Sequence, residues 1–281
     1  MASETSQVII PAGHAIITTH GSVRQESAQC WSEARSLCER NGLLNIRWAM
    51  VPGALPEKTR NDAVRGLLAD ANAGWLLQID ADMTWRPDAV LHILHTAYAQ
   101  LPHADVVGAW CPLRGDMAIP TIDSGTGTWE SVFPGNGPIE VIRTGAAFHL
   151  TKRHVYENLA DPWYRMRVPA RPIDFMLEVD NFARIKFDSR NPFMGLPGEP
   201  WEKLLKCAKD DPSIAPGSFV PAEVGEDSAF MDRVRAAGFR IFVQTDIECG
   251  HVDTRVLTAA DHKRAINDRE RMQRLLTGVT A

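Results

Sequence analysis

The chain has 281 residues, 44% of them hydrophobic and 23% charged, and its formal net charge is −5. This is the composition of a globular protein that can fill one large α/β domain or two small ones. The acidic balance argues against a protein that coats nucleic acid through bulk electrostatics, although a local basic groove remains compatible with it.

Up to about residue 111, predicted strands alternate with predicted helices. Short apolar runs are followed by stretches in which apolar residues recur every three or four positions, the period of a helix with one buried face. The expected strands are 15–19, 46–51, 75–79 and 104–110, and the expected helices are 24–40, 59–72 and one opening at Pro87. Such βαβ units predict a mostly parallel central sheet flanked by helices on both faces.

After residue 111 this alternation ends. Gly and Pro are frequent over 112–138, and a hairpin is expected over 139–150. A helix at 227–237, a strand at 240–244 and a helical tail near the C-terminus are expected further on. The segment between, 151–224, is rich in aromatic residues and proline, which predicts a loop-rich lobe.

The N-terminus and the cysteines bear on location. The first residues lack the basic start and apolar stretch of a signal peptide, and no run approaches the roughly 18 apolar residues that span a membrane. The five cysteines show no CxxC spacing, which indicates reduced thiols without structural zinc. We therefore expect a soluble cytoplasmic protein without a membrane span.

The most informative motif is LLQIDAD, residues 76–82, in which an apolar strand runs into Asp80 and Asp82. Residues two apart in extended backbone point the same way, so both carboxylates can face one ligand. Ligands of open α/β sheets bind beyond the carboxyl ends of strands. Two carboxylates there suit Mg²⁺ or Mn²⁺, which in turn would hold a diphosphate. The alternative is a turn residue followed by a solvated one.

Three further features accompany this motif. Arg60 stands where a helix is expected to open, a suitable place for an anion. Glu226 and Asp227 begin the predicted helix 227–237, and Asp227 could equally be an N-cap. His251 follows the last predicted strand and is a candidate third metal ligand, although a single His is more often structural.

The order of these motifs resembles the GT-A glycosyltransferases, in particular the family 2-like nucleotide-diphospho-sugar transferases. The resemblance covers about residues 14–253, and its most specific parts are residues 77–82, Gly225-Glu226-Asp227 and Gly238-Phe239. It implies a Rossmann-like GT-A domain over 1–257, with a nucleotide-sugar-binding half (14–111), an acceptor and catalytic half (112–257), and a C-terminal tail at 258–281.

The resemblance also implies roles for individual residues. It places Asp80 near the nucleotide ribose and Asp82 on the cation, with His251 as a further ligand; Asp80 is retained as a candidate ligand as well. Asp227 would be the base that activates the acceptor, with Glu226 beside it as a second catalytic candidate. The implied nucleotide-sugar contacts are Thr19, Arg60, Asp80 and Gly145. Gly145 lies in the stretch Thr144–Ala147 that would lie under the donor sugar.

The implied reaction moves a sugar from a UDP- or GDP-sugar to a hydroxyl acceptor, with inversion if Asp227 is the base. The acceptor stays open: a saccharide, a protein side chain, a small hydroxylated compound or a hydroxylated base in phage-type DNA. Aromatic residues of the 151–224 segment, among them Trp163 and Tyr164, are candidates for stacking on it, or they simply hold that lobe together. A nucleotidyltransferase and an inactive nucleotide-sugar-binding module are the rival functions.

Overall fold

The computed structural model describes residues 9–19, 22–53, 55–113, 120–124, 132–165, 225–252, 256–260, 263 and 267. Apart from Gly225, these residues belong to one compact unit formed by Met1–Arg165 and Glu226–Ala281, and the fold described below is that of this unit. Most of the predicted lobe at 151–224, and most of the predicted tail, lie outside the described residues.

The N-terminal half follows the predicted order of strands and helices. Its elements are β1 (Gly13–Thr19), α1 (Gln25–Arg40), β2 (Ile46–Pro52), α2 (Pro56–Ala69), β3 (Trp75–Asp80), β4 (Met83–Thr84), α3 (Ala89–His95), the π-helical turn η1 (Thr96–Gln100) and β5 (Val106–Trp110). The helices form because their apolar residues fall on one face: in α1 the buried side chains include Trp31, Ala34 and Cys38. Every residue of β1 and β5 is buried, as expected for strands covered on both faces.

Helix α2 begins earlier than predicted. Its first residue is Pro56, a position that suits proline because the first helical N–H has no partner within the helix. Arg60 therefore lies in the second turn of α2 and not at its N-terminus. The predicted start of this helix at residue 59 is therefore wrong by three residues, and the contact of Arg60 with an anion stays a prediction.

In the described part of the C-terminal half, short strands and the helices α4 and α7 follow. They are β6 (Ile122–Asp123), β7 (Pro138–Glu140), β8 (Arg143–Thr144), β9 (Phe148–Lys152), α4 (Arg153–Glu157), α7 (Glu226–Ala236), β10 (Ile241–Glu248), β11 (Gly250–Val252) and β12 (Val256–Leu257). The predicted hairpin over 139–150 is wrong. Strand β7 pairs with β10, β8 pairs with β6, and β9 lies between β3 and β5.

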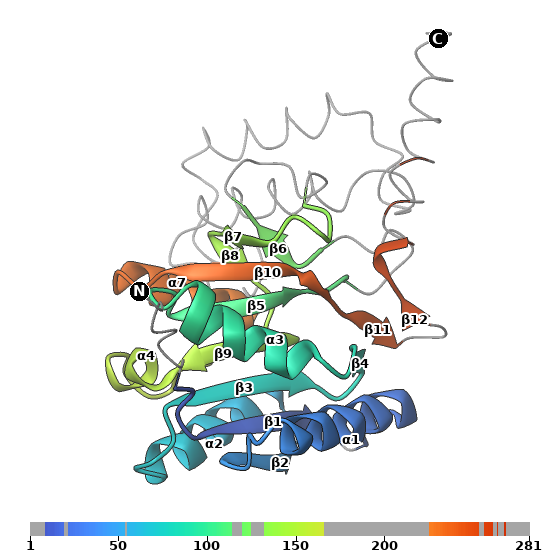
Figure 1. Cartoon of the computed structure of the whole chain (residues 1–281). Helices are drawn as coiled ribbons and strands as arrows, with labels where there is room; N and C mark the ends of the chain where they lie inside the picture. Colours follow the sequence, from blue (N-terminus) through green and yellow to red (C-terminus); the bar gives the residue numbers. More distant parts are fainter. Residues whose placement is uncertain are drawn as a thin grey trace, which may run out of the picture. The chain divides into compact units, whose positions relative to one another are not determined.

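The central sheet has seven strands in the order β2-β1-β3-β9-β5-β10-β7 (Figure 1). Strands β2, β1, β3, β5 and β10 point the same way, and β9 and β7 run against them. A smaller sheet, β12-β11-β4, lies beyond the carboxyl end of β3. This mostly parallel α/β sheet is the Rossmann-like GT-A architecture that the sequence predicts.

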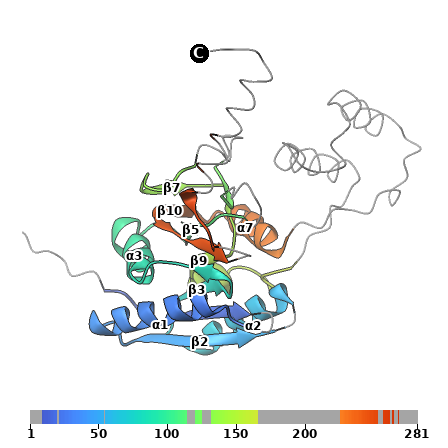
Figure 2. The same cartoon turned by 90° about the vertical axis from the view of Figure 1, so that its right-hand side faces the viewer.

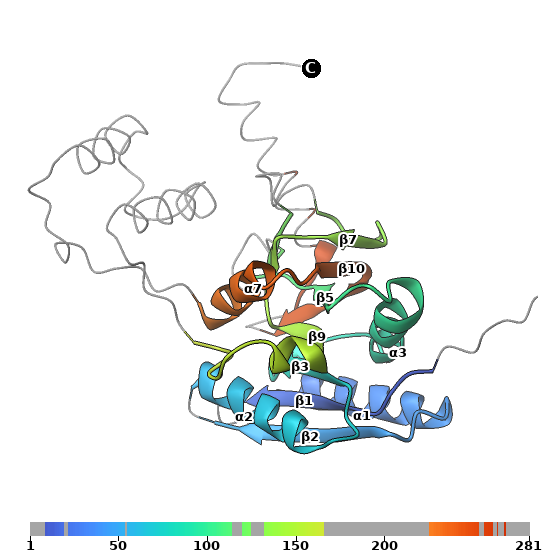
Figure 3. The same ribbon diagram turned by 90° about the vertical axis from the view of Figure 1, so that its left-hand side faces the viewer.

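Helices cover both faces of the sheet. Figures 2 and 3 show α1 and α3 on one face and α2 and α7 on the other. Each face has its own apolar cluster: Ile17, Leu77 and Val90 belong to the α1–α3 cluster, and Leu76 and Phe230 to the α2–α7 cluster. Neighbouring residues of β3 thus point to opposite faces, which determines the face on which each functional side chain lies.

The expectations on cysteines and membrane spans can be compared directly with the described residues. Cys30, Cys38, Cys111 and Cys249 are all free thiols, and the last three are buried. Within the described ranges, every helix is too short or too polar to cross a bilayer.

Candidate functional site

Asp80 is the last residue of β3 and lies on the sheet face covered by α2 and α7. Its carboxylate oxygen Oδ1 accepts a hydrogen bond from Thr18 Oγ1 at 3.1 Å and one from Arg60 Nη2 at 2.8 Å. The parallel register of β1 and β3 places Thr18 directly beside Asp80. Two donors on one oxygen hold the carboxylate in a fixed orientation.

Arg60 reaches Asp80 from the second turn of α2, and its side chain is only 5% exposed. Besides Asp80, the guanidinium donates to Glu226 Oε1 at 3.2 Å, to the carbonyl oxygen of Ala146 at 3.2 Å and to Gln78 Oε1 at 3.5 Å. Burial by itself lowers the pKa of Arg60, but the adjacent carboxylates of Asp80 and Glu226 outweigh it and raise the pKa. Arg60 is therefore a permanently charged group between two carboxylates.

Glu226 and Asp227 form the first turn of α7, where acidic side chains meet the positive end of the helix dipole. Asp227 Oδ1 accepts a hydrogen bond from the backbone N–H of Ser228 at 2.6 Å. Glu226 is 12% exposed and faces Arg60. Burial raises the pKa of Glu226, and the charge of Arg60 opposes that rise. The structure thus brings Arg60, Asp80 and Glu226 together, with Asp227 next in the chain.

Asp82 and His251 face each other at the small sheet. The antiparallel pairing of β11 with β4 places His251 opposite Met83, and the Val252 N–H donates to the carbonyl oxygen of Asp82 at 2.7 Å. His251 Nε2 lies 3.4 Å from Asp82 Oδ2, and both side chains are largely buried. Two residues about 170 positions apart are therefore held side by side by strand pairing.

The chemistry of this pair fits a cation. His251 Nδ1 lies 3.1 Å from the carbonyl oxygen of Pro112. A carbonyl can only accept, so Nδ1 carries the proton, and the Nε2 of a neutral ring presents its lone pair to Asp82. With a neutral ring, an imidazole nitrogen and a carboxylate oxygen therefore lie side by side, and a cation could bind to both. Imidazole and carboxylate are both ligands for Mn²⁺, and a histidine fixed through its other nitrogen is typical of metal sites.

No group of three or more His, Cys, Asp or Glu side chains within the described ranges is close enough to hold a metal ion by itself. Of the three predicted ligands, Asp82 and His251 lie together, whereas the Asp80 carboxylate is engaged with Arg60 and Thr18.

Gly145 belongs to a segment that packs directly against Asp80. A Cβ on Gly145 would lie 2.8 Å from the Thr121 side chain, so only glycine fits this position without a shift. The next two carbonyl oxygens accept from the Asp80 region: Ala146 from Arg60 and Ala147 from the backbone N–H of Asp80 at 2.9 Å. Gly145 therefore directly precedes two residues that contact Arg60 and Asp80, and its contact with a donor sugar stays a prediction.

Thr19 ends β1, and its hydroxyl is buried without a hydrogen-bond partner in the described part of the chain. Its neighbour Thr18 makes the bond to Asp80 instead, because Thr18 is paired with Asp80 and successive residues of a strand face opposite sides. Thr18 was missed in the sequence, and the signal that could have found it is a polar residue in an otherwise apolar strand paired with the Asp80 strand.

A buried polar layer beneath Asp80 was also missed. His149 Nδ1 donates to the Ala146 carbonyl oxygen at 3.2 Å, and its Nε2 accepts from the hydroxyl of Tyr164 at 2.9 Å. Burial, together with the nearby charge of Arg60, lowers the pKa of His149 to about 3, so its ring is neutral. The side-chain amide of Asn61 exchanges two hydrogen bonds with the backbone of Tyr164, at 2.7 and 2.9 Å.

Trp163 and Tyr164 are core residues. Trp163 is 6% exposed and Tyr164 is fully buried, stacked on Phe230 with ring centroids 4.3 Å apart. For these two residues the structure favours the packing interpretation over stacking on an acceptor. The other aromatic candidates of the lobe lie outside the described residues.

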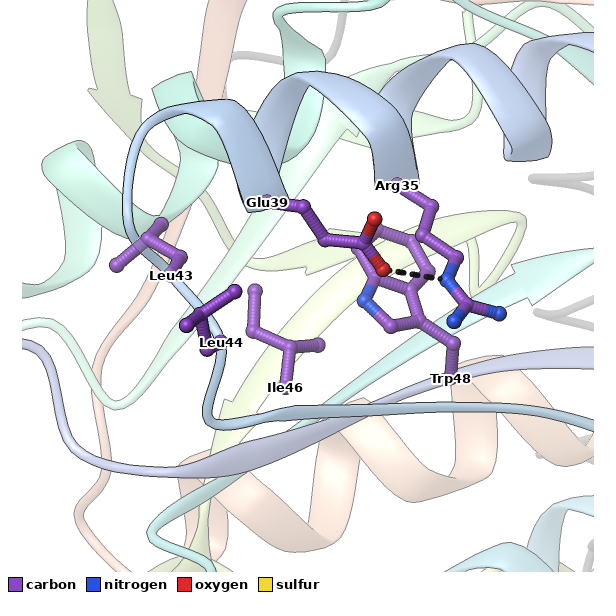
Figure 4. A pocket seen from close by; sticks show the side chains of 6 residues that line it. All are labelled: Arg35, Glu39, Leu43, Leu44, Ile46 and Trp48. Carbon is purple, nitrogen blue, oxygen red and sulfur yellow. Dashed lines mark hydrogen bonds and ion pairs between the residues drawn. The ribbon is translucent and has the colours of Figure 1, made fainter.

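A hollow elsewhere on the surface is remote from these carboxylates. It lies between the C-terminal part of α1 and the start of β2, where Arg35 and Glu39 form an ion pair at 2.8 Å beside Trp48 (Figure 4). The register of β1 with β2 places Ile46 opposite Gly13, at the amino end of the sheet. Ligands of such sheets bind at the carboxyl end, where Asp80 is found.

Comparisons with known proteins concern the fold. No protein-family model matches the chain, and no curated protein matches its sequence. Among solved structures, A197 from STIV is similar over 89% of this chain and 91% of its own, with a TM-score of 0.52 and 15% sequence identity. TarS 1-349 from S. aureus is similar over 52% of this chain and 48% of its own, with a TM-score of 0.30 and 13% identity.

A third solved structure, a glycosyltransferase involved in the glycosylation of the major capsid of PBCV-1, is similar over 54% of this chain and 68% of its own. Its TM-score is 0.29 and its identity 10%. At such identities the likeness extends to the fold alone. The chain shares the α/β fold of A197 along nearly the whole length of both proteins.

Proposed function

We propose that this chain is a glycosyltransferase that transfers a sugar from a nucleoside-diphosphate sugar to a hydroxyl acceptor with the help of Mg²⁺ or Mn²⁺. The observation that carries the proposal is the pair Asp82 and His251, 3.4 Å apart beyond the carboxyl end of β3. Asp80 lies two residues from this pair, and the resemblance of the LLQIDAD motif to GT-A enzymes supports the same function.

In this proposal Asp82 and His251 would hold the cation. Bound there, it would supply positive charge to stabilise the negative charge that develops on the departing diphosphate. Asp80, already oriented by Arg60 and Thr18, accepts hydrogen bonds from the nucleotide. The segment that contains Gly145 lies under the donor sugar.

Asp227 is proposed as the base. As the acceptor oxygen attacks the anomeric carbon, its proton moves to Asp227, the bond from that carbon to the diphosphate breaks, and the nucleoside diphosphate leaves. The N–H of Ser228 occupies Oδ1, so we assign the proton transfer to Oδ2. A carboxylate at a helix N-terminus is a weak base, but it needs to accept the proton only while the acceptor attacks. This route inverts the anomeric configuration.

Calorimetry tests the cation site. Binding of UDP and GDP is measured with Mn²⁺ and with EDTA, for the wild type, for Asp82→Ala and for the surface control Asp88→Ala. We expect affinity to fall about tenfold or more with EDTA and in Asp82→Ala, and to be unchanged in Asp88→Ala. Equal affinity in all conditions would refute the site.

Product analysis tests the base. With a donor found by screening for slow release of free nucleotide, Asp227→Asn should lower turnover by about 10² while nucleotide affinity is nearly unchanged. Proton NMR of fresh product should show inversion at the anomeric carbon. Retention would remove Asp227 from this role.

A further inference from the structure

Arg60 has almost no hydrogen-bonding capacity left for a ligand. A guanidinium has five N–H groups. Four of them donate within the protein: Nε to Glu226, one on Nη2 to Asp80, and two on Nη1 to Ala146 and, at a long 3.5 Å, to Gln78. The side chain is 5% exposed, so its contacts are made inside the protein. Its geometry is that of a residue that holds other groups.

Glu226 is directed at Arg60 in the same way. Its Oε1 accepts from Arg60 Nε at 3.2 Å, and only 12% of its side chain is exposed. The neighbouring residue Asp227 uses its carboxylate on the first turn of α7 instead. Two successive acids of one helix therefore have different partners.

The contacts of Arg60 show what Glu226 contributes at this position. Arg60 joins β3, through Asp80, to α7, through Glu226, and to the segment after Gly145, through Ala146. Buried ion pairs give little net stability compared with apolar packing, but they define geometry, because removing one partner leaves the other charge buried and unpaired. Contacts from one guanidinium to three separate elements can therefore fix the orientation of the side chains that it binds.

We propose that Glu226 is a positioning residue that acts through Arg60 on Asp80, so that the acidic first turn of α7 and the carboxylate at the end of β3 are held in one arrangement. This inference rests on the proposed function for its catalytic meaning. The network itself can be tested without any ligand.

The first test is a double-mutant cycle on unfolding in urea. Glu226 and Asp80 are linked through Arg60, so the effects of Glu226→Gln and Asp80→Asn on the unfolding equilibrium constant should fail to multiply, by about threefold or more. The same cycle in an Arg60→Lys background should show no such coupling, because lysine keeps the charge and lacks the fork. Glu39→Gln on the exposed face of α1 is the matched control and should multiply with Asp80→Asn. Multiplicative effects of Glu226→Gln and Asp80→Asn in the wild-type background would overturn the proposal.

The second test separates positioning from catalysis. In Glu226→Gln, the dissociation constant for the nucleoside diphosphate with Mn²⁺ should rise about tenfold, while the acidic limb of the pH profile of turnover is retained. Loss of turnover by about 10² with unchanged nucleotide affinity, the pattern expected of Asp227→Asn, would make Glu226 catalytic and refute positioning. If the cycle shows coupling but the wild type binds no nucleoside diphosphate, the proposed function fails and the Arg60 network stands.

Discussion

Asp80 and Asp82 are separated by one residue, yet their surroundings have little in common. Asp80 is held by Thr18 and by a buried arginine that is itself anchored at three further points. Asp82 lies in the turn before β4, and its Oδ2 is 3.4 Å from Nε2 of His251 in the small sheet. The comparison teaches that the two carboxylates of one motif can have different partners: Asp80 meets a buried arginine and a threonine, whereas Asp82 meets a histidine of the small sheet.

The largest effect should come from removing the arginine. Arg60→Met leaves the carboxylates of Asp80 and Glu226 without their counter-charge in a buried site. We expect the free energy of unfolding to fall by about 3–4 kcal/mol, somewhat discounted because Asp80 is partly exposed. Truncation of the Asp82 partner, His251→Ala, should lower the free energy of unfolding by about 1 kcal/mol or less. Urea denaturation measures both, and equal losses would abolish the distinction.

The polar layer under Asp80 should respond to pH. His149 has a pKa of about 3 in the folded protein and an ordinary one near 6.5 when unfolded. Between these values the unfolded chain binds the extra proton, so stability is full above about pH 6.5 and is lost as pH falls. The loss from this residue is at most about 3 kcal/mol by pH 4.

Urea denaturation from pH 7 to pH 4 checks this. His149→Gln should show a shallower decline than the wild type, whereas the same change at the exposed His95 should leave the slope unaltered. Parallel slopes for the wild type and His149→Gln would mean that His149 takes up its proton without opposing folding.

A ligand effect of similar size should belong to Asp82 and His251. Mn²⁺ with a nucleoside diphosphate, at 100 times the dissociation constant, should raise the free energy of unfolding by about 2.7 kcal/mol. Most of this gain should disappear in His251→Ala and on addition of EDTA. Thermal denaturation follows it, and an undiminished gain in His251→Ala would place the cation elsewhere.

The smallest effect is expected at the surface. Arg35 and Glu39 form an ion pair beside Trp48, and both side chains are about half exposed. Arg35→Ala should change the free energy of unfolding by less than about 1 kcal/mol, because solvent screens such pairs. A loss as large as that of Arg60→Met would show that burial does not explain the difference between the two arginines.

The parts of the fold predicted from sequence are those determined locally. Strands β1 and β3 are recognised by short apolar runs, and helix α1 by apolar residues at helical spacing. Each of these patterns lies within one short stretch of sequence. The hairpin predicted for 139–150 was wrong because strand pairing depends on residues far away in the sequence. The short strands of this stretch each pair with a different strand, and β9 is an antiparallel strand in the middle of the sheet.

For the candidate site, too, the sequence predicted some residues and missed the contacts that depend on distant parts of the chain. Asp80, Asp82 and His251 stand at the ends of recognisable strands, so the sequence could name them. The bond from Thr18 to Asp80 and the meeting of Arg60 with Glu226, 166 positions away, depend on strand register and helix placement. The Gln78 side chain, two residues before Asp80, was a usable signal of this network. A polar residue in a buried strand needs hydrogen-bond partners, which indicates other polar groups on the same face.

Neighbouring residues of α2 hold the chain at two points that are far apart in sequence. The side chain of Asn61 binds both the N–H and the carbonyl oxygen of Tyr164, and Arg60 binds the side chain of Glu226. One turn of α2 thus binds residues on both sides of a sequence interval of about 60 residues. Closing a loop depends only weakly on its length, by about 0.6 kcal/mol per doubling. The number of residues between these two points could therefore change at little entropic cost, while the contacts of Arg60 and Asn61 stay the same.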